Sequence, residues 1–336
     1  MQARDRGHAR QGRRSPHPGR DGDREDESTR SRIHSVENMN TTETNNALLT
    51  RPNDCDVRVG PEPADTAHPR RLPDAARVLL AVPIMFAFAT APGLLLLIPG
   101  FEEYLQHGAS DGAAVATLWA MYSIAPITAL VLVWLAMRYI DRRPFSDTGW
   151  GWNARSLPAL GIGLAATVAM IVPVAVAVQA TGVLRPMPFG TEEHPTWVVV
   201  LVALGLAFLL QGIPEELVWR GYVMQTLRTT PVVSVYISAV VFAVCHLTSS
   251  GGQQSTWERF VYLLVPFGFS LLAGALLLIT GSLWAAVGVH AGFHVATLVN
   301  TVWLGVGSGP ELWAAMGIVL GLAGAALLHR WSAKTS

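Results

Sequence analysis

Long uncharged apolar runs follow one another along the chain from residue 78 onward. The runs cover 78–100, 113–137, 156–184, 195–214, 229–257 and 259–280, then a stretch after the break Thr280-Gly281-Ser282, and finally 312–328. A helix needs about 20 apolar residues to cross the hydrocarbon core of a bilayer, and lipid leaves no partner for unpaired backbone groups. The pattern therefore predicts an all-α fold, a polytopic helical membrane protein with about eight transmembrane helices.

Residues 1–75 have a different character. They hold 13 Arg and 13 acidic residues, which are 26 of the 48 formal charges, and they lack a long apolar run. Such a segment cannot bury enough apolar surface to offset its ordering entropy, so we expect a disordered cytosolic tail ahead of a membrane domain at 76–330. The Arg/Asp/Gly/Pro bias of the first residues also makes Met39 an alternative start.

Composition narrows the class of protein further. The chain is 51% hydrophobic and 14% charged, against about 25% charged residues in soluble domains. Beyond the tail no Lys/Arg stripe remains that could bind nucleic acid. The two cysteines, Cys55 and Cys245, are too few for a disulfide framework.

Arginine accumulates at alternate ends of the predicted helices. The residues on this side are Arg70, Arg71, Arg77, Arg138, Arg142, Arg143, Arg155, Arg228, Arg330 and Lys334. The positive-inside rule places that side in the cytosol, so we expect a multi-pass cell-membrane protein with both termini cytoplasmic. Gly317 and Gly321 predict a close helix contact on the last helix, either within the chain or between two copies, which leaves the oligomeric state open.

Six ionisable residues interrupt the apolar region: Glu215, Glu216, Arg220, His246, His290 and His294. Each charge at the bilayer centre costs roughly 2.5–3.5 kcal/mol on insertion scales unless it is paired or hydrated. Glu216 and Arg220 stand four residues apart, so a structural ion pair explains them as well as a catalytic role does. A solvated position at the membrane interface would also explain the two glutamates.

The histidines favour a shared site. His246 alone fits a core histidine with a satisfied hydrogen bond, but His290 and His294 lie on one face of another helix. Two chemistries are open. Glu215 could activate a water for attack on an amide carbonyl, with His246 assisting and His290 and His294 stabilising the oxyanion. Alternatively Glu215, His246, His290 and His294 could bind Zn²⁺ and lower the pKa of its water.

These residues resemble the CAAX-protease and bacteriocin-processing (CPBP) family of intramembrane endopeptidases, also called the abortive-infection family. Its motif E-E-x-x-x-R corresponds to Glu215–Arg220, and F-x-x-x-H corresponds to Phe242–His246. The third motif, H-x-x-x-N or H-x-x-x-D, corresponds to His290–His294, where His294 replaces the Asn or Asp. The resemblance covers about residues 150–305.

The resemblance implies an intramembrane endopeptidase, a hydrolase grouped with the metalloproteases, that cleaves a membrane-associated peptide or protein substrate. It implies that Glu215 activates water, His246 assists, His290 and His294 form the oxyanion site, and Glu216 with Arg220 supports the geometry. Two alternatives remain: a non-catalytic scaffold or bacteriocin-immunity protein, and a proton-coupled transporter. At a rise of 1.5 Å per residue, Glu215 falls near the inner end of the fourth helix and His246 near the outer end of the fifth. These helices must therefore extend into the cytosol, tilt or kink for the two side chains to meet.

Overall fold

The computed structural model describes residues 72–186, 194–249 and 251–335. It is 82% helical, and the described residues form no β-strand, only an isolated bridge between Arg185 and Ser308. The all-α membrane fold expected from the sequence is confirmed. The tail expected at 1–75, with the alternative start at Met39, lies outside the described residues except for its last four positions.

Within the described residues, eight helical stretches are long and apolar enough to cross a membrane. They are Asp74–Leu97, Asp111–Asp141, Ser156–Gln179, Thr196–Thr226, Pro231–Thr248, Thr256–Thr280, Leu283–Trp303 and Pro310–Thr335. The expected number is confirmed, but several bounds differ. The largest difference is in the fourth span, which continues twelve residues beyond the predicted end at 214.

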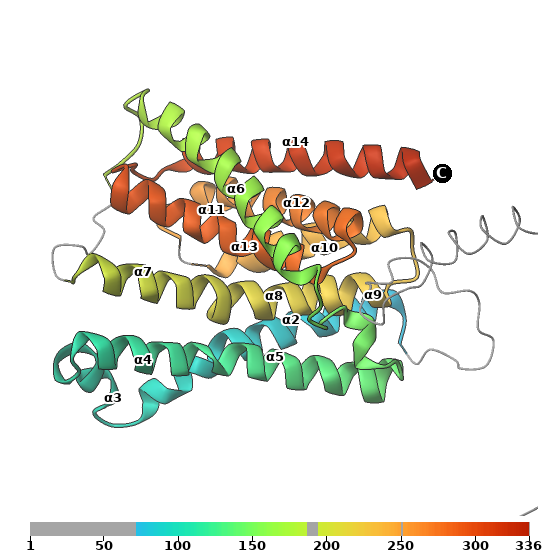
Figure 1. The fold of residues 1–336 in the computed structure, drawn as a ribbon, viewed down its shortest axis with the longest axis horizontal. Coiled ribbons are helices and arrows are strands. Elements are labelled where there is room, and N and C mark those ends of the chain that lie inside the picture. The colour runs from blue at the N-terminus through green and yellow to red at the C-terminus, as the bar shows by residue number, and fades with distance from the viewer. Residues whose placement is uncertain (1–71, 187–193, 250, 336) are drawn as a thin grey trace, which may run out of the picture. The chain divides into compact units, whose positions relative to one another are not determined.

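Most spans consist of one or two α-helices with short 3₁₀ or π segments. The α-helices are α2 (Asp74–Thr90), α3 (Phe101–Glu103), α4 (Asp111–Tyr122), α5 (Ile124–Leu135), α6 (Ser156–Gln179), α7 (Thr196–Gly205), α8 (Ile213–Glu216), α9 (Met224–Thr226), α10 (Pro231–Cys245), α11 (Thr256–Tyr262), α12 (Leu264–Thr280), α13 (Leu283–Leu298) and α14 (Pro310–Thr335). The fourth span, α7 to α9, runs between α2 and α5 on one side and α13 on the other (Figure 1). This central position gives the charged residues of the fourth span protein neighbours.

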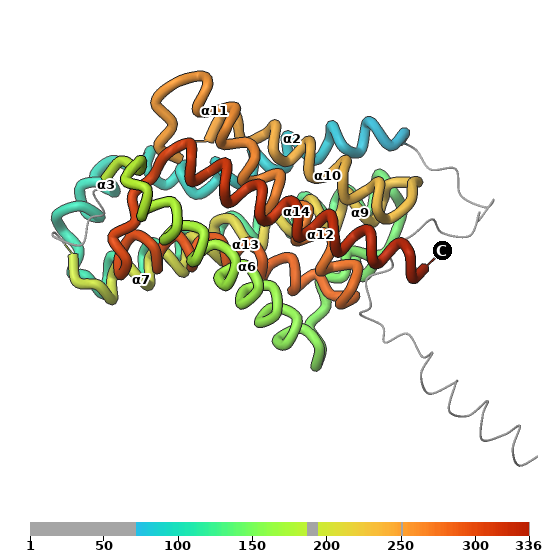
Figure 2. The backbone as a smooth tube through the Cα atoms, turned by 90° about the horizontal axis from the view of Figure 1, so that it is seen from above, coloured from blue at the N-terminus to red at the C-terminus, as the bar shows by residue number. Residues whose placement is uncertain are grey.

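Two helix crossings rely on glycine. Where α6 crosses α13, a Cβ on Gly163 or Gly288 would collide with backbone atoms of the other helix, and the same holds for Gly268 and Gly317 between α12 and α14 (Figure 2). Close backbone approach between membrane helices needs such small residues. Gly317 therefore packs within the chain, as does Gly321, whose nearest neighbour beyond its own helix is Gly268.

Helix α12 is the most enclosed helix of the bundle. Thirteen of its 17 residues are buried, whereas α4 buries only Val115 of its 12. A helix that is apolar on all sides and surrounded by other helices belongs to the core, whereas the exposed apolar faces of the outer spans suit lipid. The core includes Leu272 and Leu277, which are fully buried.

Arg77, expected among the charges ahead of the first helix, is instead buried inside α2. Its Nε lies 2.5 Å from Asp141 Oδ1 at the end of the second span, and its Nη1 lies 2.8 Å from Asp74 Oδ1. Asp74 also accepts a hydrogen bond from Arg228 Nε, in the turn after the fourth span, at 3.1 Å. These contacts link the first, second and fourth spans at the end of the bundle where both described termini lie.

Candidate active site

The two glutamates lie in a short α-helical piece between two π-helical segments. The π segments are Leu206–Gly212 and Leu217–Val223, and in each the next residue bonds five positions back: Ile213 N–H to the Phe208 carbonyl, and Met224 N–H to the Trp219 carbonyl. Pro214 has no N–H and so disturbs the regular α pattern at this point. Wide turns of this kind are common at functional sites because they redirect side chains.

Glu216 is enclosed by positively charged and hydrogen-donating neighbours. Its carboxylate lies 3.1 Å from Arg220 Nη1, and its Oε1 lies 3.0 Å from Nδ1 of His290. Arg220 in turn donates from Nη2 to the hydroxyl of Ser270 at 2.5 Å and to the Ser270 carbonyl at 3.1 Å. Glu216 and Arg220 are both fully buried. The charges that were costly for a membrane helix are thus paired, and the solvated-interface interpretation of Glu216 is wrong.

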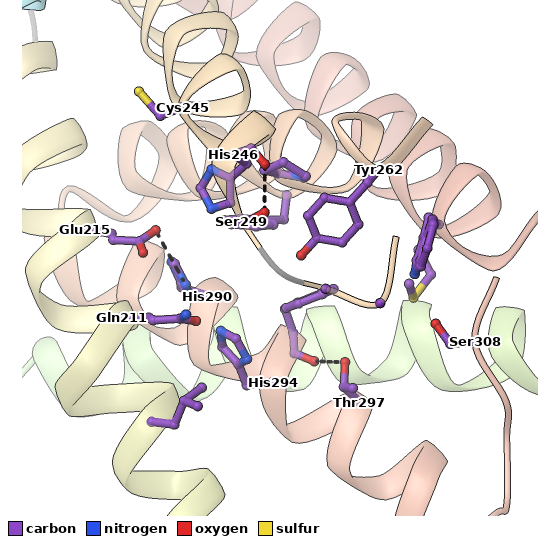
Figure 3. A pocket seen from close by; sticks show the side chains of 18 of the residues that line it. Gln211, Glu215, Cys245, His246, Ser249, Tyr262, His290, His294, Thr297 and Ser308 are labelled. Atoms are coloured by element: carbon purple, nitrogen blue, oxygen red, sulfur yellow. Dashed lines mark hydrogen bonds and ion pairs between the residues drawn. The ribbon is translucent and has the colours of Figure 1, made fainter. Parts of the chain in front are cut away.

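Glu215 has different surroundings. It is 5% exposed, and its Oε2 lies 3.9 Å from Nε2 of His290, too far for a direct hydrogen bond. This Oε2 atom has no hydrogen-bond partner among the described residues. Figure 3 shows the Glu215 carboxylate and the His290 ring turned toward each other. Because residue 215 is one position before Glu216, about 100° around the helix, it faces the adjacent cavity.

His246 directly follows α10. Its Nδ1 lies 2.8 Å from the Phe242 carbonyl oxygen, which can only accept, so Nδ1 carries the proton and Nε2 holds the free lone pair. The ring also packs against Phe242 at 4.4 Å between centroids. His246 and Glu215 line one cavity. The helix lengths expected from the sequence would have kept them apart, but the fourth span is longer than expected and α10 ends just before His246, which brings both side chains to this cavity.

His290 and His294 occupy one face of α13. Their rings stack with centroids 5.4 Å apart. Gly288 lies two residues before His290, and Gly292 lies two residues before His294. Each glycine is therefore about 200° around the helix from its histidine, and both glycines face α6. The close crossing with α6 on one side of α13 therefore presents the two histidines on the other side.

A cavity of about 680 Å³ joins these side chains. Of the six residues singled out from the sequence, Glu215, His246, His290 and His294 line it, while Glu216 and Arg220 lie behind its wall. The convergence of three histidines and one glutamate from three spans, expected from the sequence, is present in the structure (Figure 3).

Comparison with protein families gives a match over the same part of the chain. Residues 196–296 match the Rce1-like family, whose description is "type II CAAX prenyl endopeptidase Rce1-like". The match covers 101 of the 336 residues, and over this segment the chain is similar to the Rce1-like family. The matched range contains all six residues singled out above and agrees with the resemblance to the CPBP family. A search of curated proteins found no match to the chain.

The matched segment has the donor chemistry of a zinc site, since imidazole and carboxylate both bind Zn²⁺. The placement of the donors does not fit one. Across 72–186, 194–249 and 251–335, no three His, Cys, Asp or Glu side chains are gathered so that they could hold a metal ion. We therefore derive no chemical step through a metal.

The matched segment also contains polar residues around the cavity that the sequence motifs did not reveal. Gln211, one helical turn before Glu215, and Cys245 and Tyr262 line the cavity, and Ser270 holds Arg220. Asn300, beyond the matched range, lines it as well. Gln211 and Ser270 are isolated polar residues in apolar runs, whereas Cys245 precedes His246 and Asn300 precedes Thr301. Their polarity was the available signal, but it does not say which way a side chain points.

Proposed function

We propose that the chain is an endopeptidase that hydrolyses a peptide bond of a membrane-associated substrate within this cavity. The observation that carries the proposal is the difference between the two adjacent glutamates. Glu216 lies 3.1 Å from Arg220 and 3.0 Å from His290, while Glu215, at the cavity wall, comes no closer than 3.9 Å to the His290 ring nitrogen. A buried carboxylate that is not held by a cation is available as a general base.

In the proposed reaction Glu215 takes a proton from water as the water oxygen attacks the substrate carbonyl carbon. His246, whose Nε2 is free for a hydrogen bond, orients the water. His294 donates a hydrogen bond to the oxygen that gains negative charge. When the C–N bond breaks, the proton on Glu215 passes to the leaving amine. His290 is positioned by Glu216, which holds its Nδ1 proton, so its Nε2 faces Glu215 as an acceptor.

The membrane orientation forms part of the proposal. The end of the bundle that carries Asp74 and Thr335 also carries Arg138, Arg143, Arg155, Arg228, Arg330 and Lys334. The other end carries fewer basic residues, Arg185 and Arg259, together with Glu102 and Glu103 in α3 and with Asp111 and Glu311 in the first turns of their spans. We place the basic end in the cytoplasm of a cell membrane.

The test is a comparison of wild type with Glu215→Gln, which keeps shape and hydrogen bonding but removes basicity. Cleavage, followed as the lengths of membrane peptides in cells, should fall by about 100-fold or more, the scale of general-base catalysis. Wild-type cleavage in Glu215→Gln would remove Glu215 from the mechanism. A cellular phenotype that persists in this variant, with no cleavage by either form, would favour the scaffold or immunity alternative.

A further inference from the structure

The cavity reaches one end of the bundle only. Its lining includes Ser249, Gly251 and Gly252 after α10, Gly307 and Ser308 before α14, and the first turns of α14 at Leu312 and Trp313. These positions lie at the end opposite to Asp74 and Thr335. The turns at the other end, Leu227–Thr230 and Thr280–Ser282, contribute no lining residue. The space beside Glu215 therefore extends away from the described termini.

A polar stripe follows α13 in that direction. His290, His294, Thr297 and Thr301 are spaced by four, three and four residues, so they lie on one face of the helix, and all four line the cavity. Asn300 lines it beside them. Figure 3 shows His294 and Thr297 following one another along this helix on the side of the pocket.

These polar groups offer acceptors. The hydroxyl of Thr297 donates its proton to the Phe293 carbonyl at 3.0 Å, and that of Thr301 donates to the Thr297 carbonyl at 2.9 Å. Only their oxygen lone pairs remain for a ligand. The side-chain oxygen of Asn300 is buried, with the residue 3% exposed, and has no partner among the described residues. A buried acceptor without a partner is unfavourable until a donor reaches it.

The spacing of the acceptors matches a peptide main chain. Thr297 lies near the end of α13 and Thr301 in the π-helical segment Val299–Trp303 that continues it, so they are separated by at most about 6 Å along the axis, at 1.5 Å per residue. In an extended peptide, N–H groups on the same side repeat about every 6.6 Å. A hydrocarbon chain has no N–H group and gains nothing from such a row of oxygens.

We infer that Thr297, Asn300 and Thr301 form a binding subsite for the main-chain N–H groups of an extended peptide, which enters from the end of the bundle opposite to the termini. The inference rests on the proposed function for the identity of the ligand as a peptide. Thr297, Asn300 and Thr301 all lie beyond the range matched by the Rce1-like family.

The first test compares variants that remove or keep the acceptor oxygens. Thr297→Val and Thr301→Val should each lower kcat/KM for cleavage about tenfold, through KM, because one hydrogen bond to substrate is lost. Thr297→Ser and Thr301→Ser should retain it. Thr280→Val is the matched control: Thr280 makes the same hydrogen bond, to the Leu276 carbonyl at 2.7 Å, away from the cavity. Equal kinetics in the valine and serine variants would overturn the subsite.

The second test does not depend on cleavage. In a background with Cys55→Ser and Cys245→Ser, Ser308→Cys should react with a membrane-impermeant maleimide from the face opposite to the one that labels Lys334→Cys. A pool of short mixed-sequence peptides with blocked ends should slow labelling of Ser308→Cys, and the same pool with N-methylated amides should not. Labelling of both cysteines from one face, or equal protection by both pools, would overturn the inference.

The two tests separate the subsite from the reaction. Protection by the amide pool without any cleavage would contradict the proposed endopeptidase and support the subsite. Cleavage that depends on Glu215 but is unchanged in both valine variants would support the endopeptidase and overturn the subsite.

Discussion

Glu216 and His290 hold each other across two spans, with Oε1 of the carboxylate 3.0 Å from Nδ1 of the imidazole. Since Glu216 is also paired with Arg220, it acts as the acceptor, and Nδ1 of His290 carries the proton. The ring is thereby fixed with Nε2 toward Glu215. One glutamate positions the histidine, and the adjacent one is the general base in the proposed mechanism.

We expect Glu216→Gln to destabilise the protein by about 3–5 kcal/mol, because Arg220 would remain as a buried charge without its counter-ion. The double variant Glu216→Gln, Arg220→Met should be more stable than Glu216→Gln alone, since it removes both charges. Thermal unfolding in detergent measures this. Glu215→Gln serves as the control and should unfold near the wild-type temperature, because no cation pairs with Glu215 at hydrogen-bond distance. Additive losses in the double variant would contradict this pairing.

The ion pairs at the basic end differ in burial, and so should their contributions to stability. Arg77 and Asp141 have side chains that are 1% exposed, whereas Arg228 is 46% exposed. Asp141→Asn should therefore cost about 3–5 kcal/mol. Arg228→Gln, which breaks the exposed pair with Asp74, should cost less than about 1 kcal/mol. Similar unfolding temperatures for the two variants would show that the buried pair does not fasten the first two spans.

The orientation can be checked with reporter fusions. Reporters joined after Arg143 and after Ser336 should both report cytosol, and a reporter joined after Glu193 should report the outside. The reason is that Glu193 is separated from each of the other two positions by an odd number of spans, one from Arg143 and five from Ser336. A cytosolic signal after Glu193 would be incompatible with this arrangement of the spans.

The number and type of spans could be predicted because apolar runs of about 20 residues have few alternatives in lipid. The end of the fourth span could not. Glu215, Glu216 and Arg220 look like the polar boundary of an apolar run, yet they continue inside the helix because Ser270 and His290, from two other spans, pair with them. Arg77 was placed outside its helix for the same reason: Asp141, its partner, is 64 residues away.

The catalytic candidates could be predicted because charged and imidazole groups are rare in membrane helices. The division of roles between Glu215 and Glu216 was only partly visible. The four-residue spacing from Glu216 to Arg220 predicted their pairing, but the contact with His290 depends on how the fourth and seventh spans cross. Asn300 and its neighbour Thr301 were not singled out because uncharged polar side chains at the end of an apolar run carry no signal until the cavity beside them is known.

The last prediction concerns His294, which stands where the resembling family has Asn or Asp. We expect His294→Asn to retain cleavage within a few-fold of wild type, because an amide N–H₂ can still donate to the oxyanion. His294→Ala removes the donor and should lower kcat by about 100-fold to 1,000-fold, the usual effect of losing one such group. Bound metal, measured in the purified wild type and in His294→Asn, tests the zinc alternative at the same time. If zinc were held by His294 and His290, metal content and activity would fall together in His294→Asn, since Asn is a poor zinc ligand. Retained activity without stoichiometric metal would leave hydrogen bonding as the role of His294, in agreement with the absence of a three-residue metal-binding group among the described side chains.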